Sequence, residues 1–204
     1  MSTPILSGRS DFEPIREELN ALSYSLRGSL SIGSLVSEEW DRGVKSSSKE
    51  DFLKSGVTSF NSTEDLFNKP EWANVAAFLF SFAKNMIDSV DPDSKPFHLI
   101  NMWTTIYPTG SFVPEHVHSN SYISGVFYSK APEGCGDIVF HDPSWVAKTM
   151  LMHTNEPRFP NVETKYSIKA EEGLMVLFPS WLPHRSLPNT SNEDRIIVSF
   201  NIGY

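Results

Sequence analysis

Apolar residues recur at spacings of three and four in two stretches of the first half of the chain. They are Ile15, Leu19, Leu22 and Leu26 between Phe12 and Leu26, and Trp72, Val75, Phe78, Leu79, Phe82, Met86 and Ile87 between Glu71 and Val90. Such spacings place the apolar side chains on one face of an α-helix. Pro70 stands just before the second stretch, where a missing amide hydrogen costs nothing, and Pro92 follows its end. The pattern therefore predicts two helices, each with one face packed on a core.

The pattern changes after Phe97, where short runs rich in Ile, Val, Phe and Tyr alternate with turn residues. These runs span residues 99–107, 123–128, 136–140, 165–170, 174–178 and 195–202. Proline, glycine and asparagine mark the turns between them, as at Pro108 and Gly173. Many short strands with regular turns predict a sandwich or a barrel. Helices first and strands afterwards give an α+β chain whose helices pack on one face of a β-core.

We expect one structural domain, because 204 residues are enough to bury one substantial core. Residues 1–97 are predicted as a helical and loop region that packs on a β-core formed by residues 98–204. The polar segment 41–68 lacks periodicity and predicts loops with one or two short helices. Residues 145–160 form a long insertion between predicted strands, which fits a lid over a site.

Composition and charge narrow the class of protein. The net charge of −8 argues against nucleic-acid binding, which needs clustered Lys and Arg. The single cysteine, Cys135, excludes an internal disulfide and a Cys-based zinc site, and it suits a reducing compartment. The N-terminus lacks the features of a signal peptide, and the longest apolar run, Val75 to Phe82, is too short to cross a bilayer. We therefore expect a cytoplasmic protein with no nucleic-acid or membrane partner.

Three histidines are the first candidates for a functional site. His116 and His118 are two residues apart, so on an extended segment both imidazoles face the same side and can meet one ion. His184 follows an apolar run that leads into a loop, where the ligand sites of barrels gather. Imidazole suits iron, zinc, copper and nickel. Each histidine alone could be an ordinary loop or core residue, but together they predict a metal site with positions left open for other ligands.

Arg195 opens the last apolar run of the chain, Ile196 to Ile202. A charged side chain at this position either faces solvent, paired with Glu193 or Asp194, or points into a cavity and binds an anion. The planar guanidinium can hold a carboxylate through two parallel hydrogen bonds. Beside three histidines, the second interpretation predicts an anchor for a dicarboxylate.

Five segments, in this order, resemble the iron(II)/2-oxoglutarate-dependent dioxygenases, and most of all a small bacterial and phage branch of that superfamily. They are 107–118 (YPTGSFVPEHVH), 124–128 (SGVFY), 136–143 (GDIVFHDP), 178–184 (FPSWLPH) and 195–201 (RIIVSFN). The resemblance covers residues 98–203, about half of the chain. It implies a double-stranded β-helix, a jelly-roll fold shared with the cupins, with iron at its open end.

The resemblance implies that His116 and His184 are two of the ligands of Fe(II). The common triad of these enzymes is His-x-Asp or His-x-Glu with a distal histidine, and here His118 occupies the middle position. Three neutral imidazoles would leave the ion at +2, a charge that a bound dianion can balance. Asp142 is the nearest carboxylate that could replace His118 as a ligand, and we rank it second because it follows a different predicted strand. Glu115 alternates to the other face of its segment.

The cosubstrate of such enzymes is 2-oxoglutarate, and the resemblance implies residues for it. Arg195 matches the arginine that pairs with the distal carboxylate of the cosubstrate. Tyr128 and Tyr107 resemble tyrosines that face the same ligand, and Ser199 adds a hydroxyl near Arg195. The implied activity is hydroxylation of a small-molecule or peptide substrate by molecular oxygen, with release of succinate and CO2.

The alternative is a metal-binding cupin or a non-catalytic jelly-roll module with the same fold. The spacing around His116 and His118 fits the first cupin motif. However, the glutamate that metal-binding cupins carry shortly after this pair is absent, because Tyr122 and Ile123 occupy those positions. Cupins also have no required counterpart of Arg195. The sequence therefore favours the oxygenase.

Overall fold

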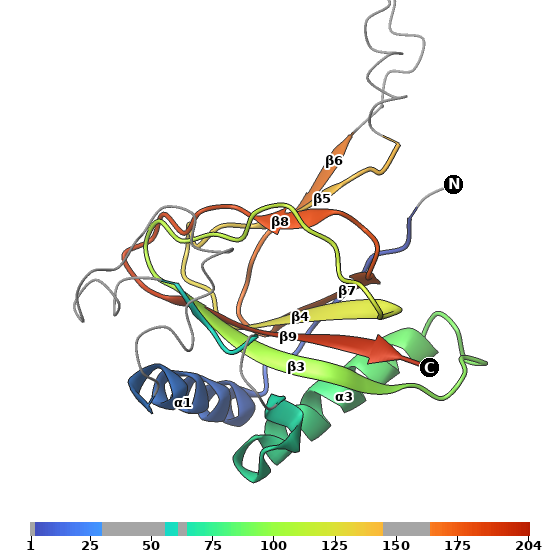
Figure 1. Ribbon diagram of the computed structural model, residues 1–204, viewed down its shortest axis with the longest axis horizontal. Helices are drawn as coiled ribbons and strands as arrows, with labels where there is room; N and C mark the ends of the chain where they lie inside the picture. Colours follow the sequence, from blue (N-terminus) through green and yellow to red (C-terminus); the bar gives the residue numbers. More distant parts are fainter. Residues whose placement is uncertain (1–2, 30–55, 61–64, 145–163) are drawn as a thin grey trace, which may run out of the picture.

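The computed structural model of the protein describes residues 3–29, 56–60, 65–144 and 164–204. These residues form two antiparallel sheets, with two long helices beneath the larger sheet in Figure 1. The larger sheet holds, in spatial order, β1 (Leu6–Arg9), β7 (Leu174–Pro179), β4 (Ile123–Lys130), β9 (Arg195–Gly203), β3 (His98–Tyr107) and β2 (Val57–Thr58). The smaller sheet holds β6 (Lys165–Ile168), β5 (Ile138–His141) and β8 (His184–Ser186).

The two predicted helices are confirmed as α1 (Glu13–Ser29) and α3 (Ala73–Asp88). Two short 3-10 helices, η1 (Leu66–Asn68) and η2 (Pro70–Trp72), lead into α3. Leu19 and Leu79 are fully buried where the helices meet the sheet. Burying one such side chain stabilises the fold by about 1.5–3 kcal/mol. The apolar faces that predicted the helices therefore also attach them to the sheet.

Alternation along β9 divides its side chains between the two faces of the larger sheet. Ile196, Val198, Phe200 and Ile202 belong to the core shared with the helices. The intervening residues, among them Arg195 and Ser199, face the opposite side, toward the smaller sheet. The polar residues of this strand therefore reach the space between the two sheets.

A second apolar cluster fills part of the space between the sheets. Val126, Tyr128 and Phe178 come from the larger sheet, and Ile138 and Phe140 from the smaller one. The rings of Phe140 and Phe178 meet edge to face, with centroids 5.0 Å apart. This cluster holds the sheets together beside the predicted functional residues.

Gly125 allows β4 to pack closely against the ring of Phe200. A Cβ atom at this position would come within 2.2 Å of the Phe200 ring, closer than any real contact. Since β4 lies between β7 and β9, the glycine lets the large ring fill the centre of the sheet. Its role is therefore one of packing.

The region 1–97 differs from the prediction in two places. It was predicted as helix and loop, but β1 and β2 are strands that form the two edges of the larger sheet. β1 pairs with β7 and β2 pairs with β3, both antiparallel. Both strands are too short for alternation to stand out in a sequence, since β1 has four residues and β2 has two.

Two further expectations concern the insertion between the predicted strands and the possibility of a membrane-spanning helix. The insertion 145–160, predicted as a lid, lies outside the described residues. Among the residues that are described, no helix has the length and apolar character needed to span a bilayer.

Candidate functional site

Backbone hydrogen bonds bring the predicted metal ligands together. The N–H of His116 donates to the carbonyl oxygen of His184 at 3.0 Å, and the N–H of His184 donates back to His116, also at 3.0 Å. Two residues further on, the N–H of His118 donates to the carbonyl oxygen of Ser180 at 2.9 Å. The segment with both histidines thus runs antiparallel to the segment that carries the third.

The three imidazoles converge on one point. Ligand nitrogens of His116, His118 and His184 all lie within 4.8 Å of one another. The Nε2 atoms of His116 and His118 are 3.2 Å apart. A metal–imidazole bond is about 2.0–2.1 Å long, so two nitrogens at roughly a right angle around one ion lie about 3 Å apart. The donor set therefore fits a single ion, and three ligands leave other coordination positions open.

Each ring is oriented by a partner on its Nδ1 side. Nδ1 of His116 lies 2.8 Å from the carbonyl oxygen of Pro114, and Nδ1 of His184 lies 2.9 Å from that of Leu182. A carbonyl oxygen can only accept, so these Nδ1 atoms carry the proton. The unprotonated Nε2 of each ring then faces the shared point, which is the usual arrangement of histidine ligands.

Burial keeps the three rings uncharged at neutral pH. Desolvation lowers the pKa of His116 to about 4, and desolvation together with the nearby His116 ring lowers the pKa of His184 to about 2. Burial also lowers the pKa of His118, against the opposite effect of its hydrogen bond with Asn201. Neutral imidazole is the form that binds a metal ion.

Arg195 is one of the most deeply buried side chains of the protein, with 1% of its surface exposed. Its Nη1 donates to the carbonyl oxygens of Cys135 at 2.6 Å, Gly136 at 2.8 Å and Leu187 at 3.3 Å, and its Nη2 donates to Ser186 Oγ at 3.0 Å. Gly136 has a φ of +91°, a left-handed conformation that glycine adopts without strain. The guanidinium is therefore fixed in position by uncharged oxygens.

No carboxylate within the described part of the chain pairs with Arg195. The acidic neighbours considered for a surface ion pair have other partners: Glu193 pairs with Lys130 at 3.1 Å and Asp194 with Arg27 at 2.8 Å. Nε of Arg195 is buried, and no described group accepts its hydrogen. A buried cation without a counter-ion attracts an anion strongly, because the surroundings screen its charge poorly.

One cavity, of about 50 Å³, joins the three histidines to Arg195. Tyr107, Tyr128 and Ser199 also line it, so the structure brings every predicted site residue to the same space. The guanidinium carbon of Arg195 lies 4.1 Å from the centre of the Tyr107 ring, a cation–π contact. Burial raises the pKa of Tyr107 and of Tyr128, although the charge of Arg195 acts in the opposite direction. Both phenols are therefore protonated and able to donate a hydrogen bond.

The two carboxylates weighed against His118 lie apart from the histidine cluster. Asp142 accepts a hydrogen bond from the N–H of Ser144 at 2.8 Å and is not among the side chains that meet there. Glu115 pairs with His141, as expected for a residue that alternates to the other face. The geometry therefore favours His118 over Asp142 as the companion of His116.

Sequence reasoning missed the polar side chains behind His118. Ser124 and Asn201 are directly opposite each other in the β4–β9 pairing, and both are within hydrogen-bond distance of His118 Nδ1. A polar residue in an apolar strand was the available signal for each. Which strand residues meet depends on the register, however, and the sequence alone does not specify it.

Comparison with known families and structures gives one family and many similar folds. The family described as "Putative 2OG-Fe(II) oxygenase" matches residues 101–201. No protein of curated function matches the sequence. The matched segment contains all three histidines and the buried arginine.

Solved structures of low sequence identity share the fold. A prolyl-4-hydroxylase from Pseudomonas putida is 12% identical with a TM-score of 0.59, over 98% of this chain and 93% of that one. A viral collagen prolyl hydroxylase from Paramecium Bursaria Chlorella virus-1 is 14% identical with a TM-score of 0.53, over 97% and 95%. HygX from Streptomyces hygroscopicus, solved with nickel and 2-oxoglutarate, is 14% identical with a TM-score of 0.58, over 98% and 83%.

The structural similarity is consistent with the architecture of this protein, in which two sheets face each other and helices pack on the larger one. It confirms the predicted α+β fold with a double-stranded β-helix core. The histidine cluster lies within the matched segment, between the two sheets of this fold. The chain belongs to the 2OG-Fe(II) oxygenase family of oxidoreductases.

Proposed function

We propose that the protein is an Fe(II)- and 2-oxoglutarate-dependent oxygenase that hydroxylates an organic substrate. In this reaction one atom of molecular oxygen enters succinate and the other enters the substrate. 2-Oxoglutarate becomes succinate and CO2, and a C–H bond of the substrate becomes C–OH. His116, His118 and His184 would hold the iron through their Nε2 atoms. The iron and the keto acid supply the oxygen-activating chemistry when bound.

The remaining residues of the cavity bind and orient the cosubstrate. Arg195 pairs with the distal carboxylate of 2-oxoglutarate, to which the phenols of Tyr128 and Tyr107 can donate hydrogen bonds. Ser199 lies on the same face of β9 and offers a further hydroxyl. Because the three imidazoles are neutral, the 1-carboxylate of the cosubstrate offsets part of the +2 charge of the ion, while its distal carboxylate offsets the charge of Arg195.

The observation that carries the proposal is the position of one buried, unpaired arginine in the same cavity as three neutral imidazoles. A metal site alone needs no such cation, and an arginine that only stabilises the fold is usually paired with a carboxylate. HygX, whose structure holds nickel and 2-oxoglutarate, gives a precedent for both ligands in a similar fold.

The proposal is tested by adding anaerobic Fe(II) and 2-oxoglutarate to the purified protein, then oxygen, and measuring succinate. Wild-type protein should form succinate, slowly when the prime substrate is missing. His116→Ala and His184→Ala should lose both stoichiometric Fe(II) binding, measured by calorimetry, and succinate formation. Iron binding that is unchanged in either variant would remove that histidine from the ligand set.

The same experiment separates the oxygenase from the alternative, a metal-binding cupin or a non-catalytic jelly-roll module. Such a module would bind a metal through the histidines but would neither bind 2-oxoglutarate nor convert it. Metal binding without any affinity for 2-oxoglutarate would therefore favour the alternative.

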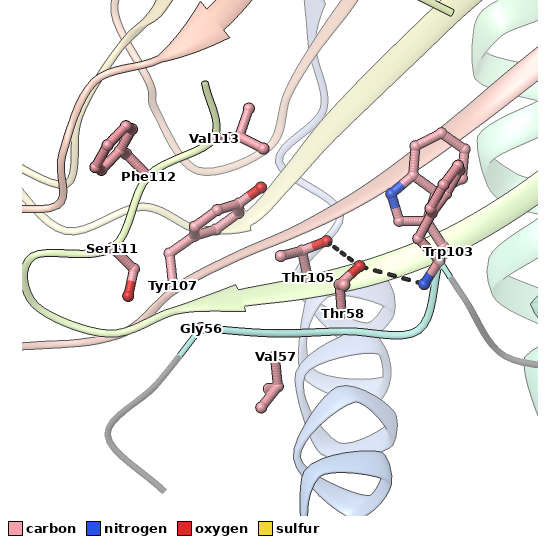
Figure 2. A pocket seen from close by; sticks show the side chains of 10 residues that line it. Gly56, Val57, Thr58, Trp103, Thr105, Tyr107, Ser111, Phe112 and Val113 are labelled. Carbon is pink, nitrogen blue, oxygen red and sulfur yellow. Dashed lines mark hydrogen bonds between the residues drawn. The ribbon is translucent and has the colours of Figure 1, made fainter. Parts of the chain in front are cut away.

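A second cavity, of about 30 Å³, adjoins the first, and Figure 2 shows the side chains that line it. Trp103, Tyr107 and Val113 line both cavities. The exposed rings of Phe60 and Phe112 lie on the outer side of the second cavity. We infer that the substrate approaches the histidines along this side.

The second cavity also indicates the chemical character of the substrate. None of its described lining residues carries a charge. The ring of Trp103 lies between the exposed ring of Phe60 and the ring of His118. Its centroid is 4.9 Å from that of Phe60 and 5.6 Å from that of His118. The part of the substrate that enters here is therefore uncharged and largely apolar, which a small molecule or a peptide side chain can both supply.

Phe112→Ala tests this inference once a substrate is in hand, because it should raise the KM for that substrate several-fold. Phe12→Ala is the matched control, since Phe12 is 51% exposed and Phe112 is 48% exposed, but Phe12 lies beside α1 and packs on Phe78. An equal effect of the two changes on KM would place the substrate elsewhere.

A further inference from the structure

His118 stands where the common triad of this family carries a carboxylate, and a short polar chain lies directly behind it. Nδ1 of His118 is 2.7 Å from Asn201 Oδ1 and 2.8 Å from Ser124 Oγ. Both partners are deeply buried, Ser124 at 0% and Asn201 at 4% exposure. A buried polar group is held in place when its hydrogen bonds are satisfied, and it is costly when they are not.

The amide of Asn201 is itself oriented by a neighbour. Its Nδ2 donates to Asn101 Oδ1 at 2.8 Å, so its Oδ1 is the atom that faces His118. An amide oxygen only accepts hydrogen bonds, so the proton between the two side chains must belong to His118 Nδ1. The opposite tautomer would place two lone pairs 2.7 Å apart.

Ser124 completes this arrangement from the adjacent strand. Its hydroxyl oxygen lies 2.7 Å from Asn201 Oδ1 and 2.9 Å from Ser180 Oγ. The single hydroxyl proton goes to one of these two oxygens, so the Ser124 oxygen can accept a hydrogen bond from His118 Nδ1. Two acceptors from two strands, β4 and β9, therefore face the same N–H.

On its other side, the His118 ring presents the unprotonated Nε2 to His116. His116 is oriented in the same sense by Pro114, and the two Nε2 atoms are 3.2 Å apart. Two nitrogen lone pairs directed at one point create a strong preference for a cation there.

We propose that Asn201 and Ser124 are positioning residues that hold His118 as the Nδ1–H tautomer. This tautomer allows an imidazole to serve at the ligand position where a carboxylate is common in the family. The inference rests on the proposed function in that the cation is taken to be the catalytic metal. The three hydrogen-bonded side chains Asn101, Asn201 and Ser124 are all uncharged. They therefore orient the His118 ring without adding negative charge to the metal site.

The test compares two replacements of nearly equal size. Asn201→Asp keeps an acceptor facing His118, and Asn101 can turn its amide to donate to the new carboxylate. Asn201→Leu removes the acceptor. Asn20→Leu is the matched control, because Asn20 Oδ1 accepts a hydrogen bond from Ser129 in the same strand β4 at 2.7 Å. Ser129 contributes to the other face of β4, away from the histidines.

The first measurement is the tautomer of His118 in metal-free protein, from long-range ¹H–¹⁵N NMR of histidine-labelled samples. Wild type, Asn201→Asp and Asn20→Leu should show the Nδ1–H form. Asn201→Leu should show a mixture of both tautomers. A His118 ring that carries its proton on Nε2 in the wild type would overturn the proposal without any variant.

The second measurement is Co(II) affinity by calorimetry, with circular dichroism to verify the fold. Asn201→Leu should bind Co(II) at least about tenfold more weakly than wild type, within the range seen when partners of metal ligands are removed. Asn20→Leu should bind as tightly as wild type, and Asn201→Asp at least as tightly, because a carboxylate behind the ring raises the basicity of the ligand. Wild-type affinity together with a wild-type tautomer in Asn201→Leu would overturn the proposal.

Ser124→Ala is the substitute variant for the Co(II) measurement if Asn201→Leu fails to fold. It removes one of the two acceptors and should weaken Co(II) binding several-fold, and unchanged binding would count against the proposal. Neither measurement needs 2-oxoglutarate or turnover. A wild-type protein that binds Co(II) through the Nδ1–H tautomer but forms no succinate would overturn the proposed function and leave this inference standing.

Discussion

At the scale of single residues, Arg195 carries the strongest information about function. Burying a charge is costly, and proteins usually offset the cost with an opposite charge. Here three carbonyl oxygens and one hydroxyl accept hydrogen bonds from the two terminal nitrogens of the guanidinium, but none of these partners offsets its charge. The fold therefore maintains an unbalanced positive charge next to the histidines, and an anionic ligand restores the balance.

Replacing Arg195 should weaken the binding of 2-oxoglutarate. Arg195→Ala should cost at least about 2 kcal/mol of binding free energy, because it leaves a desolvated carboxylate unpaired. Arg195→Lys should recover only part, since an ammonium lacks the two-pronged geometry. Calorimetry of the metal-loaded protein measures both affinities. Near-normal affinity in the alanine variant would favour the cupin interpretation.

Because Arg195 also donates hydrogen bonds to the surrounding loops, its replacement can disturb their structure, and a second variant that leaves these bonds intact is needed. Tyr128→Phe removes one hydroxyl from the cavity and should weaken 2-oxoglutarate binding while the chain remains folded. Tyr24→Phe is its control, because the Tyr24 hydroxyl bonds Asp194 on the surface.

The third ligand can be identified by a pair of substitutions. His118→Ala should lose most metal affinity, whereas Asp142→Ala should keep it, because only His118 lies in the histidine cluster. His118→Asp should retain iron, since it restores the common carboxylate at the same position. Fe(II) calorimetry ranks the three variants, and the reverse order for His118→Ala and Asp142→Ala would identify Asp142 as the ligand.

The sequence was informative about some of these residues and silent about others, for a physical reason. His116, His118, His184 and Arg195 were predicted because their chemistry is unusual beside apolar runs. Asn201 was not predicted, because its role depends on which residues β3 and β4 place beside it. Pairing register is a property of the assembled sheet, which a single strand does not encode.

At the scale of elements, prediction succeeded where the pattern was long enough to repeat. The helices α1 and α3 and the strands β3, β4, β7 and β9 lie close to their predicted ranges. β1, β2 and β8 were missed because they have only four, two and three residues. Such strands form through pairing with a longer neighbour, and their own sequences contribute little.

The centre of the larger sheet depends on a glycine, which gives a prediction about stability. Gly125→Ala should lower the free energy of unfolding by about 1–3 kcal/mol, because the new methyl group would overlap the Phe200 ring. Gly56→Ala is the control, since its Cβ would meet only ordinary contacts of 3.5 Å or more. Chemical denaturation measures both changes, and equal stability of the two variants would contradict the packing argument.

At the scale of the whole molecule, the helices and the β-core share one hydrophobic interior. One face of the larger sheet packs on α1 and α3, and the other faces the smaller sheet and the candidate site. Removal of the helices would expose Met102, Ile106, Phe127, Val198 and Phe200 together. An exposed apolar surface of this kind favours aggregation. We therefore expect residues 1–97 to be required for folding.

A fragment of residues 98–204 tests this expectation. It should be insoluble, or soluble only as aggregates, whereas the complete chain should unfold in one cooperative transition. Size-exclusion chromatography and NMR of the fragment provide the measurement. A monomeric fragment with a well-dispersed spectrum would show that the two regions are separate folding units.

The mutual backbone hydrogen bonds of His116 and His184 hold these two predicted ligands side by side without the help of an ion. Because the chain itself aligns these two ligands, an arriving ion finds them in place and needs only to exchange water for imidazole. Stripping the ion with a chelator should likewise leave the fold ready to be filled again. Divalent ions differ in their intrinsic affinity for imidazole, with copper and nickel above iron. The identity of the bound metal is then decided by which ions are supplied, and preparations from different media should differ in metal content and in activity.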